Sequence, residues 1–193
     1  MAIPTTGNIY LLGGGEDGPQ TASLELMKKD GGLNKAAEQG ATVFAVCAGF
    51  QVIGSSLPGF DGQIIDGLGL VDVNTIVNAA PRSVGELVVQ PSRSGLPVLT
   101  GFENHQGLTR LGPGVNPLGK VISGIGFDQV EGVWQGNVIG TYMHGPGLAR
   151  NPELADALIE SATGTILSPF EDKWANQFAD ERRTSLLASK THK

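Results

Sequence analysis

The segment ATVFAVCAGFQVIG, residues 41–54, constrains the fold of this chain more than any other part of its sequence. Its first half, ATVFAV, is an apolar run of strand length. Such runs are typical of strands in a parallel sheet that helices cover on both faces. The second half, CAGFQVIG, has helical spacing, with Val52 and Ile53 expected to point inward. The segment therefore predicts a buried strand that turns directly into a helix.

The sequence on either side of this segment extends the pattern. NIYLL predicts a strand over 9–12, followed by a glycine-rich loop, a helix that ends at Gly31-Gly32, and a short helix over 34–39. Further on, short strand-like runs are separated by Gly, Pro and Asn, and VWQGNVIGTYMH predicts a hairpin that turns near Gly136-Asn137. We therefore predict an α/β fold with a mostly parallel sheet flanked by helices and an antiparallel portion.

Two helices are predicted at the C-terminal end. Asn151-Pro152-Glu153 combines a capping residue, proline at the first helical position and an acid near the positive end of the helix dipole. The last helix places Phe170, Trp174 and Phe178 four residues apart, which makes one aromatic stripe. We expect this stripe to pack on the core; a surface for a partner is the alternative.

Length and composition exclude several classes of protein. A chain of 193 residues predicts one domain, over residues 1–193. A single cysteine forms no internal disulfide, which favours the reducing cytoplasm. The net charge of −6 gives no support for binding nucleic acid or an anionic membrane. We also find no signal peptide, no apolar run long enough to span a membrane, no metal-ligand cluster and no cofactor signature.

The single cysteine, Cys47, lies where the predicted strand meets the predicted helix. Ala45 and Gly49 lie two residues before and after it, and small residues at these positions are typical of a nucleophile elbow. A thiol at a helix N-terminus is expected to have a lowered pKa, which increases the reactive thiolate. The backbone N–H of Ala48 would point at an oxyanion formed on the attacked carbonyl. A buried structural cysteine is the alternative.

A thiol nucleophile needs a base, and the chain has three histidines. His192 lies in the polar tail and is not a candidate. His105 and His144 both follow strand-like runs, at positions where catalytic side chains gather in parallel-sheet proteins. We favour His144, because the apolar run VIGTYM delivers it at the end of a strand, and keep His105 as the alternative.

The glycine-rich loop LLGGGEDG, residues 11–18, offers backbone N–H groups without side-chain obstruction and predicts a second oxyanion donor. Glycines at 13, 15 and 18 also match the G-x-G-x-x-G spacing of dinucleotide-binding loops. This match is weak in a chain with 29 glycines, and no acidic strand end follows about 20 residues later. We therefore do not predict nucleotide binding there.

Several of these motifs together resemble one family. VCAGFQVIG resembles the nucleophile motif of class I (triad-type) glutamine amidotransferases, and YLLGGGEDGPQ resembles their oxyanion loop. GTYMHGPGLARNP and GFENHQG resemble the cobyric-acid-synthase-like branch. Within that branch, the chain is most similar to GatD-type subunits, the glutaminases of lipid II isoglutaminyl synthases. The resemblance covers nearly the whole chain and implies the flavodoxin-like fold of the family.

The resemblance also implies a reaction, the hydrolysis of L-glutamine to glutamate and ammonia. A MurT-like Mur ligase subunit would form a heterodimer with the chain and use the ammonia to amidate D-glutamate of lipid II in peptidoglycan synthesis. ATP is expected on that partner alone. The resemblance assigns catalysis to Cys47 and His144. It assigns oxyanion binding to Gly14, Gly15 and Ala48, and substrate binding to Arg82 and Gln51.

The sequence departs from the family pattern at two places. The glutamate that usually follows the catalytic histidine by two residues is replaced by Pro146. The resemblance therefore implies a Cys–His dyad, or a carboxylate from elsewhere, such as the partner subunit. The chain also begins almost at the segment matching IYLLGGGED, so we expect it to lack the family's first strand–helix–strand section.

Three other functions remain open from the sequence. One is a cobyric-acid-type amidotransferase domain in cobalamin synthesis. Another is a non-catalytic scaffold of the same fold that binds a partner. The third is a cysteine hydrolase that acts on another substrate.

Overall fold

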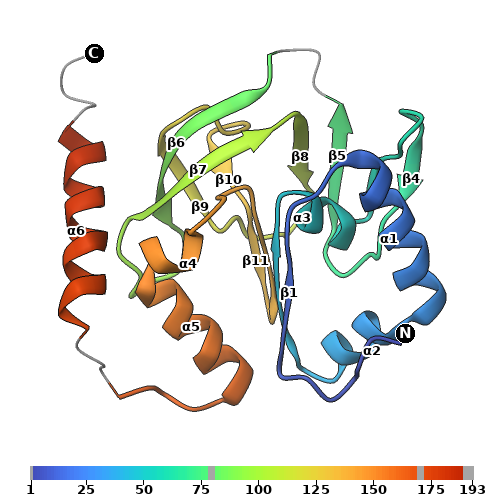
Figure 1. The fold of residues 1–193 in the computed structure, drawn as a ribbon, viewed down its shortest axis with the longest axis horizontal. Coiled ribbons are helices and arrows are strands. Elements are labelled where there is room, and N and C mark those ends of the chain that lie inside the picture. The colour runs from blue at the N-terminus through green and yellow to red at the C-terminus, as the bar shows by residue number, and fades with distance from the viewer. Residues whose placement is uncertain (1, 78–80, 169–171, 189–193) are drawn as a thin grey trace.

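The structure is a computed structural model, and it describes residues 2–77, 81–168 and 172–188. These residues form three four-stranded sheets with helices on both sides of the first (Figure 1). Phe170 and His192 lie outside the described residues.

The first sheet contains the buried strand that the sequence predicts. β1 and β12 both pair with β2 in parallel, and β11 pairs with β12 in antiparallel fashion. Only Gly136 and Asn137 separate β11 from β12, which confirms the predicted hairpin turn. In spatial order the strands are β1 (Ile9–Leu12), β2 (Thr42–Val46), β12 (Val138–Thr141) and β11 (Val133–Gln135).

Side chains of β2 enter the core on both faces of this sheet. Val43 and Ala45 belong to one apolar cluster, together with Leu24 and Phe50. Phe44 points the other way, into a second cluster. Successive residues of a strand face opposite sides, so an apolar residue at every position is buried only when both faces are covered. The prediction of a doubly covered parallel strand is confirmed.

The helices lie on opposite sides of the first sheet (Figure 1). Gly31 ends α1 in the left-handed conformation, at φ 67°, and its N–H donates to Met27 O, as the sequence predicts. No helix of the described residues is long and apolar enough to cross a membrane. On one side are α1 (Asp17–Asp30), α2 (Gly32–Glu38) and α3 (Ala48–Ile53), and on the other are α4 (Gly147–Arg150), α5 (Pro152–Thr163) and α6 (Lys173–Ala188).

The start of α5 differs in one detail from its prediction. Pro152 is its first residue, as expected, but the side chain of Asn151 does not cap the helix. Instead, it accepts a hydrogen bond from the Thr100 N–H and donates to Thr100 O and Gly147 O. Asn151 is fully buried, and its amide joins the helix to a neighbouring strand.

The β11–β12 pair gives the first sheet its predicted antiparallel portion, and the remaining strands, most of them paired in antiparallel fashion, form two further sheets. The sequence did not predict the strands over 56–58, 64–66, 107–111, 119–123 and 130–131, which are two to five residues long. The second sheet has the order β10 (Val130–Glu131), β9 (Gly119–Ser123), β6 (Ser83–Pro91) and β7 (Leu99–His105). The third has the order β4 (Ile64–Asp66), β3 (Ser56–Pro58), β5 (Val73–Val77) and β8 (Gly107–Leu111).

A backbone bridge links the segment after β12 to the second sheet. His144 lies three residues beyond the end of β12 and forms an isolated antiparallel bridge with Phe102 of β7. Its N–H donates to Phe102 O at 2.8 Å. This bridge ties the segment carrying His144 to the strand that ends at His105.

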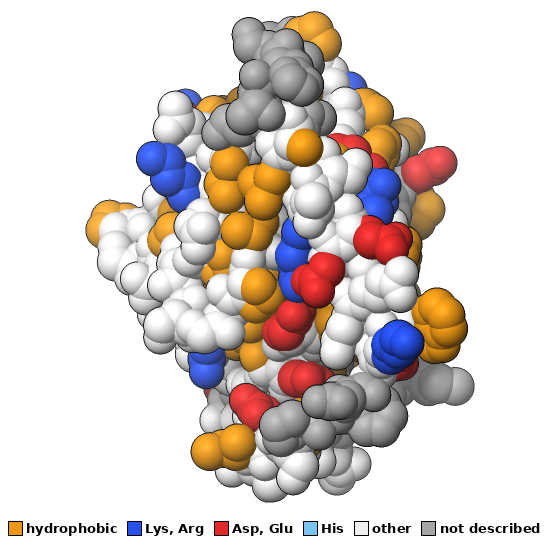
Figure 2. Space-filling model, turned by 90° about the vertical axis from the view of Figure 1, so that its left-hand side faces the viewer, with side chains coloured by type: hydrophobic (Ala, Val, Ile, Leu, Met, Phe, Trp, Pro, Cys, Tyr) orange, Lys and Arg blue, Asp and Glu red, His pale blue; other side chains and the backbone are white. Residues whose placement is uncertain are grey.

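Helix α6 corrects the prediction that its aromatic stripe packs on the core. Trp174 is 75% exposed and Phe178 is 43% exposed. Ala179 is the buried residue on the side of the helix that contacts the rest of the protein. On the same helix, Arg182 forms an ion pair with Glu86, and Arg183 forms one with Glu153. Figure 2 accordingly shows charged and hydrophobic side chains mixed on this face of the molecule. Ion pairs, rather than the aromatic stripe, orient this helix.

Candidate active site

Cys47 occupies the predicted turn between strand and helix. β2 ends at Val46, α3 begins at Ala48, and Cys47 between them has φ 55° and ψ −110°. A positive φ is rare for a residue other than glycine and is typical of strained functional turns. The Cys47 N–H donates to Thr141 O at 2.8 Å, which anchors the turn to β12.

Gly49 allows this turn to pack against the end of β1. A Cβ atom at position 49 would lie 2.8 Å from Leu12 O and 2.7 Å from Leu12 Cβ. The Gly49 N–H also donates to Gly13 O at 3.2 Å. The close approach of α3 to β1 is the reason that the elbow needs a small residue here.

Replacing Gly49 with alanine is therefore expected to destabilise the protein by about 1–3 kcal/mol, because the Leu12 backbone must move. Chemical denaturation of Gly49→Ala measures this loss. Gly13→Ala is the control, since a Cβ there meets nothing within 4 Å. Equal unfolding free energies for the two variants would contradict the packing argument.

The glycine-rich loop after β1 covers both candidate catalytic residues. A Cβ atom at Gly14 would lie 3.2 Å from His144 Cε1 and 3.5 Å from Cys47 Cβ. A Cβ atom at Gly15 would lie 3.9 Å from the Cβ of Ala48. The three predicted oxyanion residues thus lie around the predicted nucleophile and base, at the ends of two neighbouring strands.

The electrostatics of Cys47 differ from the sequence-based expectation. Burial raises the pKa of the thiol above its usual value, because the side chain is only 8% exposed. A hydrogen bond from the Ala48 N–H and the charge of Arg82 lower the pKa of this thiol, but by less than burial raises it. The six-residue helix α3 does not reverse that balance. The expected lowering of the thiol pKa is therefore wrong for the chain alone.

His144 is held in its neutral form. Burial lowers the pKa of its imidazole, and the charges of His105 and Arg82 lower it further. Its Nε2 atom is buried and has no hydrogen-bond partner among the described residues. An unpaired buried nitrogen of this kind costs about 1–3 kcal/mol and marks a position where a partner group could bind.

A cavity of about 150 Å³ opens beside Cys47. This volume suits a small polar metabolite better than a drug-sized ligand, which typically needs about 300 Å³ or more. Gly14 and His144 lie next to Cys47 but form no part of the cavity wall. Five of the seven predicted site residues line it: Gly15, Cys47, Ala48, Gln51 and Arg82.

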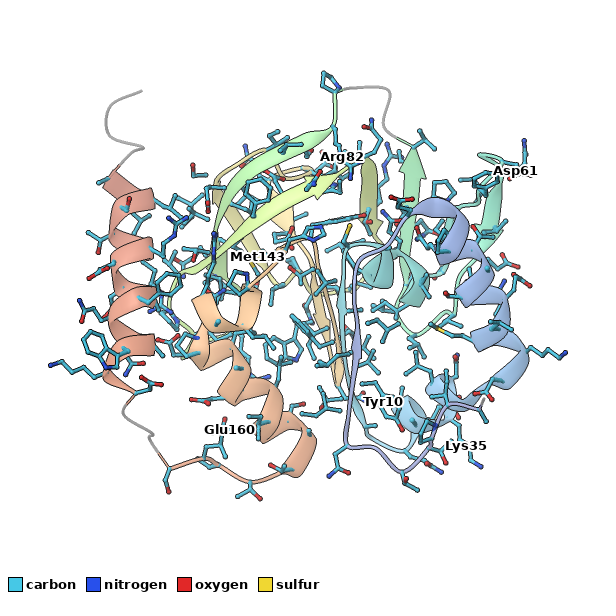
Figure 3. All side chains as sticks on the ribbon, viewed as in Figure 1. Tyr10, Lys35, Asp61, Arg82, Met143 and Glu160 are labelled. Atoms are coloured by element: carbon cyan, nitrogen blue, oxygen red, sulfur yellow. The ribbon has the colours of Figure 1, made fainter. Side chains whose placement is uncertain are left out.

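Arg82 is positioned at the cavity by Asn104 of β7. Its Nε donates to Asn104 Oδ1 at 2.5 Å and its Nη2 donates to Asn104 O at 3.1 Å. Figure 3 shows Arg82 beside β7, above the interior where Met143 lies. Asn104 was not predicted as a site residue, although it lies inside the GFENHQG motif.

Gln51 belongs to a chain of hydrogen-bonded polar side chains that runs from the cavity into the core. Its Oε1 accepts from Gln20 Nε2 at 2.8 Å, and its Nε2 donates to the Tyr142 hydroxyl at 3.3 Å. The Tyr142 hydroxyl also contacts Thr109 Oγ1 at 2.7 Å. Burial raises the pKa of Tyr142 to about 12, so this hydroxyl stays protonated. Gln20 and Tyr142 were not predicted, because nothing in their local sequence distinguishes them.

His105, the alternative base, also lines the cavity, but its ring nitrogens are engaged. Nδ1 lies 2.8 Å from Gly107 O, and Nε2 lies 3.5 Å from Glu103 Oε2. A ring held between two acceptors has no free nitrogen to take a proton from Cys47. The geometry favours His144 as the base. The described residues contain no group of three or more His, Cys, Asp or Glu placed to hold a metal ion.

Comparison with known proteins places this site in context. Residues 2–152 match the family model described as a CobB/CobQ-like glutamine amidotransferase domain. The subunit GatD of the glutamine-hydrolysing lipid II isoglutaminyl synthase from Staphylococcus aureus is 34% identical over 190 residues, covering 96% of this chain and 76% of that protein. A probable cobyric acid synthase from Methanoregula boonei is 33% identical over 147 residues, covering 72% of this chain and 28% of that protein.

A solved structure agrees with these sequence matches. The crystal structure of a glutamine amidotransferase aligns with a TM-score of 0.62 and 26% identity, covering 82% of this chain and 80% of that one. The predicted fold class is confirmed by this alignment.

Proposed function

Because the chain belongs to the CobB/CobQ-like glutamine amidotransferase family and is a glutamine-hydrolysing enzyme, we propose that it does this chemistry with Cys47 as nucleophile and His144 as base. The observation that carries the assignment is the approach of Gly14 to both residues: a Cβ there would lie 3.5 Å from Cys47 Cβ and 3.2 Å from His144 Cε1. One oxyanion loop therefore serves one Cys–His pair.

In the proposed reaction, Cys47 Sγ attacks the side-chain amide carbon of L-glutamine, while His144 takes the thiol proton. The tetrahedral intermediate collapses when His144 returns that proton to the departing nitrogen, and ammonia leaves. Water then attacks the γ-glutamyl thioester, again with His144 as base, and releases glutamate and the free thiol.

The oxyanion of each tetrahedral intermediate would be stabilised by backbone N–H groups of the Gly14–Gly15 loop and of Ala48. In the free site the Ala48 N–H donates to the Cys47 sulfur, so it already points at the place where chemistry occurs. Removal of one such donor typically costs about 100-fold or more in rate.

Arg82 would bind the α-carboxylate of glutamine. Its guanidinium lines the cavity, and Asn104 fixes the orientation of its planar fork. Gln51, on the same wall as Cys47, would complete the pocket.

Arg82→Ala is expected to raise the KM for glutamine by about ten-fold or more while kcat falls less, because a charged hydrogen bond made in both ground and transition states is lost. Steady-state glutamate formation measures both constants. Arg93→Ala is the matched control, since Arg93 stacks on Trp134 and does not line the cavity. An unchanged KM for glutamine would remove Arg82 from the binding site.

The proposed biological role follows the GatD relative. The chain would deliver ammonia to a MurT-like Mur ligase subunit, which would use ATP to amidate D-glutamate of lipid II in the cytoplasm. The GatD relative covers 96% of this chain, whereas cobyric acid synthases of similar identity cover 60% to 81%, which supports this role over a cobyric-acid-type amidotransferase.

The partner would also complete the catalytic site. Pro146 stands where related enzymes have an orienting glutamate, and His144 Nε2 is buried without a partner among the described residues. With a neutral thiol and a neutral imidazole at rest, the isolated chain is poorly activated. A carboxylate from the partner would make His144 more basic and couple hydrolysis to use of the ammonia.

Covalent labelling tests the proposal. A diazoketone analogue of glutamine should alkylate Cys47, faster in the presence of the partner subunit, and excess L-glutamine should protect it. Mass spectrometry locates the adduct. If Cys47 stays unlabelled with and without the partner, the glutaminase assignment fails, and a scaffold or another substrate becomes the better reading. Equal rates of hydrolysis with and without the partner would contradict completion by the partner.

A further inference from the structure

Two carboxyl groups are buried among the described residues, and each holds a different segment of the chain. Glu103 lies on the side of β7 opposite to Asn104, because strand side chains alternate. It accepts the N–H groups of Ile125 at 2.6 Å and Gly126 at 3.1 Å, in the loop between β9 and β10. Glu131 is the last residue of β10 and is only 3% exposed. The proposed reaction uses neither acid directly.

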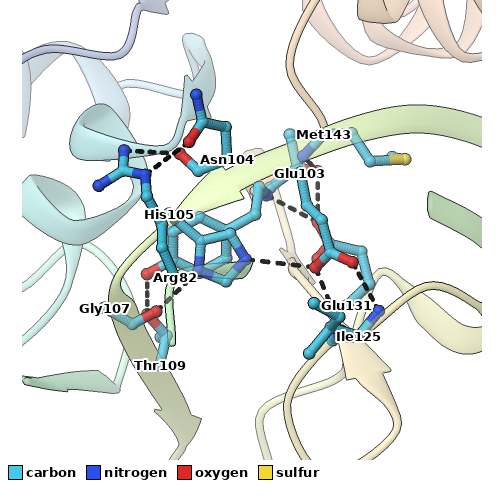
Figure 4. A network of polar contacts seen from close by, with 12 residues as sticks. Arg82, Glu103, Asn104, His105, Gly107, Thr109, Ile125, Glu131 and Met143 are labelled. Carbon is cyan, nitrogen blue, oxygen red and sulfur yellow. Dashed lines mark hydrogen bonds and ion pairs between the residues drawn. The ribbon is translucent and has the colours of Figure 1, made fainter. Parts of the chain in front are cut away.

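Glu131 holds the end of β12 through a single oxygen atom. Its Oε1 accepts the Thr141 hydroxyl at 2.5 Å and the Tyr142 N–H at 2.7 Å. The Thr141 hydroxyl oxygen accepts the backbone N–H of Met143 at 3.0 Å in turn. Figure 4 shows Glu131 and Met143 within this network. One carboxyl oxygen therefore holds two consecutive backbone N–H groups, the first directly and the second through a hydroxyl.

The segment that Glu131 holds needs acceptors of this kind. β12 ends at Thr141, and the two residues that follow lie outside any strand. Tyr142 and Met143 are nevertheless buried, at 5% and 2% exposed. Backbone N–H groups that leave a sheet inside the core lose their strand partners and cannot reach water, so side chains must accept their hydrogen bonds.

Gly132 allows Glu131 to reach this segment. It is the one residue between β10 and β11, where the chain passes from the second sheet to the first. Its φ is 57°, and a Cβ atom there would lie 2.3 Å from Gly140 O on β12. The glycine therefore permits a close approach of the two backbones that a side chain would prevent.

The segment held by Glu131 also connects the proposed nucleophile to the proposed base. Thr141 O accepts the Cys47 N–H at 2.8 Å. His144 follows Met143 directly, and its own N–H donates to Phe102 O at 2.8 Å. The backbone N–H groups at 142, 143 and 144 thus each have an acceptor, and a shift of this short segment would move His144 relative to Cys47.

We infer that Glu131 is a positioning residue for the proposed catalytic pair: its carboxyl oxygen fixes the backbone between Thr141 and His144 and thereby places the imidazole against Cys47. This inference rests on the proposed roles of Cys47 and His144. The expected effect is large, because a misplacement of about 1 Å in a catalytic group can cost about 100-fold in rate.

Kinetics of two variants in the partner complex test the inference. In Glu131→Leu no acceptor remains, so the kcat for glutamine hydrolysis should fall about ten-fold to 100-fold. The KM should stay within about two-fold, because Glu131 does not line the cavity. Glu131→Gln keeps an oxygen that can accept both hydrogen bonds, so its kcat should stay within about three-fold of the unaltered enzyme. Loss of stability alone would produce neither the split between kcat and KM nor the rescue by glutamine.

Substitution of Thr141 tests the same contact from the other side and decides the matter if Glu131→Leu does not fold. Thr141→Val removes the hydroxyl but keeps the branched shape, and it should lower kcat as Glu131→Leu does. Thr141→Ser keeps the hydroxyl and should restore kcat. In the double variant with Glu131→Leu, the loss should be smaller than the product of the two single losses, because both changes break one network.

Asn137→Ala is the matched control. Asn137 lies immediately before β12, at the end of the strand away from Thr141, and its side-chain amide donates to Ala37 O and Ala41 O. The variant thus also loses two hydrogen bonds to a neighbouring element. Its kcat should stay within about two-fold of the unaltered enzyme, even where thermal unfolding shows lower stability.

Hydrogen exchange measured by NMR on the full chain tests the contact without any assay of activity. The amides of Tyr142 and Met143 should exchange about ten-fold faster or more in Glu131→Leu and Thr141→Val than in the unaltered chain. In Asn137→Ala and Glu131→Gln, these two amides should keep their slow exchange.

Three results would overturn the inference. They are an unchanged kcat in folded Glu131→Leu, a loss of kcat that Glu131→Gln does not restore, and unchanged exchange of the Tyr142 and Met143 amides in Glu131→Leu. The exchange result stands whether or not the chain hydrolyses glutamine, whereas failure of Cys47 labelling would count against the proposed function.

Discussion

Cys47→Ser is expected to lower glutamine hydrolysis by about 1,000-fold or more while leaving the fold intact. Serine has nearly the same size as cysteine, so the elbow at φ 55° should be retained. The hydroxyl, however, is a far weaker acid than a thiol, and the neutral His144 of the resting site cannot ionise it effectively. Glutamate formation in the partner complex measures the loss, and thermal unfolding checks the fold.

The double variant Cys47→Ser/Ser92→Cys is the matched control for this experiment. It restores one thiol to the chain, on the exposed surface after β6. Its activity should stay as low as that of the single variant, because a thiol needs the elbow and the oxyanion loop to react. Binding of the partner subunit should survive in both variants. Retained hydrolysis in Cys47→Ser would exclude Cys47 as the nucleophile.

His144→Gln is expected to reduce kcat by about 100-fold to 10,000-fold, the usual contribution of a general base. Glutamine keeps a polar side chain of similar length but cannot take up the proton of Cys47. Without His144, no base assists deprotonation of Cys47. The pH dependence of its alkylation rate should then follow the raised pKa of the thiol alone. A stopped assay of glutamate and the pH dependence of alkylation measure these two effects.

Met143→Leu is the matched control for His144→Gln. Met143 is the neighbouring residue and is only 2% exposed, and leucine has a similar volume. Its kcat should stay within about two-fold of the unaltered enzyme, so a large loss in both variants would indicate a local packing defect. A kcat unchanged in His144→Gln would return His105 to consideration as the base.

The sequence predicted the parts of the site that depend on local pattern. The apolar run before Cys47 predicted a doubly covered strand, and β2 sends side chains into both apolar clusters. The small residue at 49 predicted a close approach of helix and strand, which the Leu12 contact confirms. Local pattern succeeds here because the strand–turn–helix segment specifies its own geometry.

Features that depend on distant contacts were missed or predicted wrongly. The pKa of Cys47 follows from burial by the whole fold, which outweighs the short helix α3. Asn104 acquires a role only because β7 pairs with β6 and so brings it beside Arg82, 22 residues away in sequence. The outward aromatic stripe of α6 has the same origin, since ion pairs with Glu86 and Glu153 set the rotation of the helix.

The alternation along β7 has a consequence for how this enzyme can change over evolution. Glu103, Asn104 and His105 serve opposite walls of the site from adjacent positions of one strand. Insertion or deletion of a single residue between the Phe102 bridge and His105 would exchange the two faces. It would turn the side chains at positions 103 and 105 to the side that Asn104 now occupies, and the hydrogen bonds between Asn104 and Arg82 would be lost. We therefore expect lineages of this enzyme to tolerate substitutions in β7 far better than changes in its length.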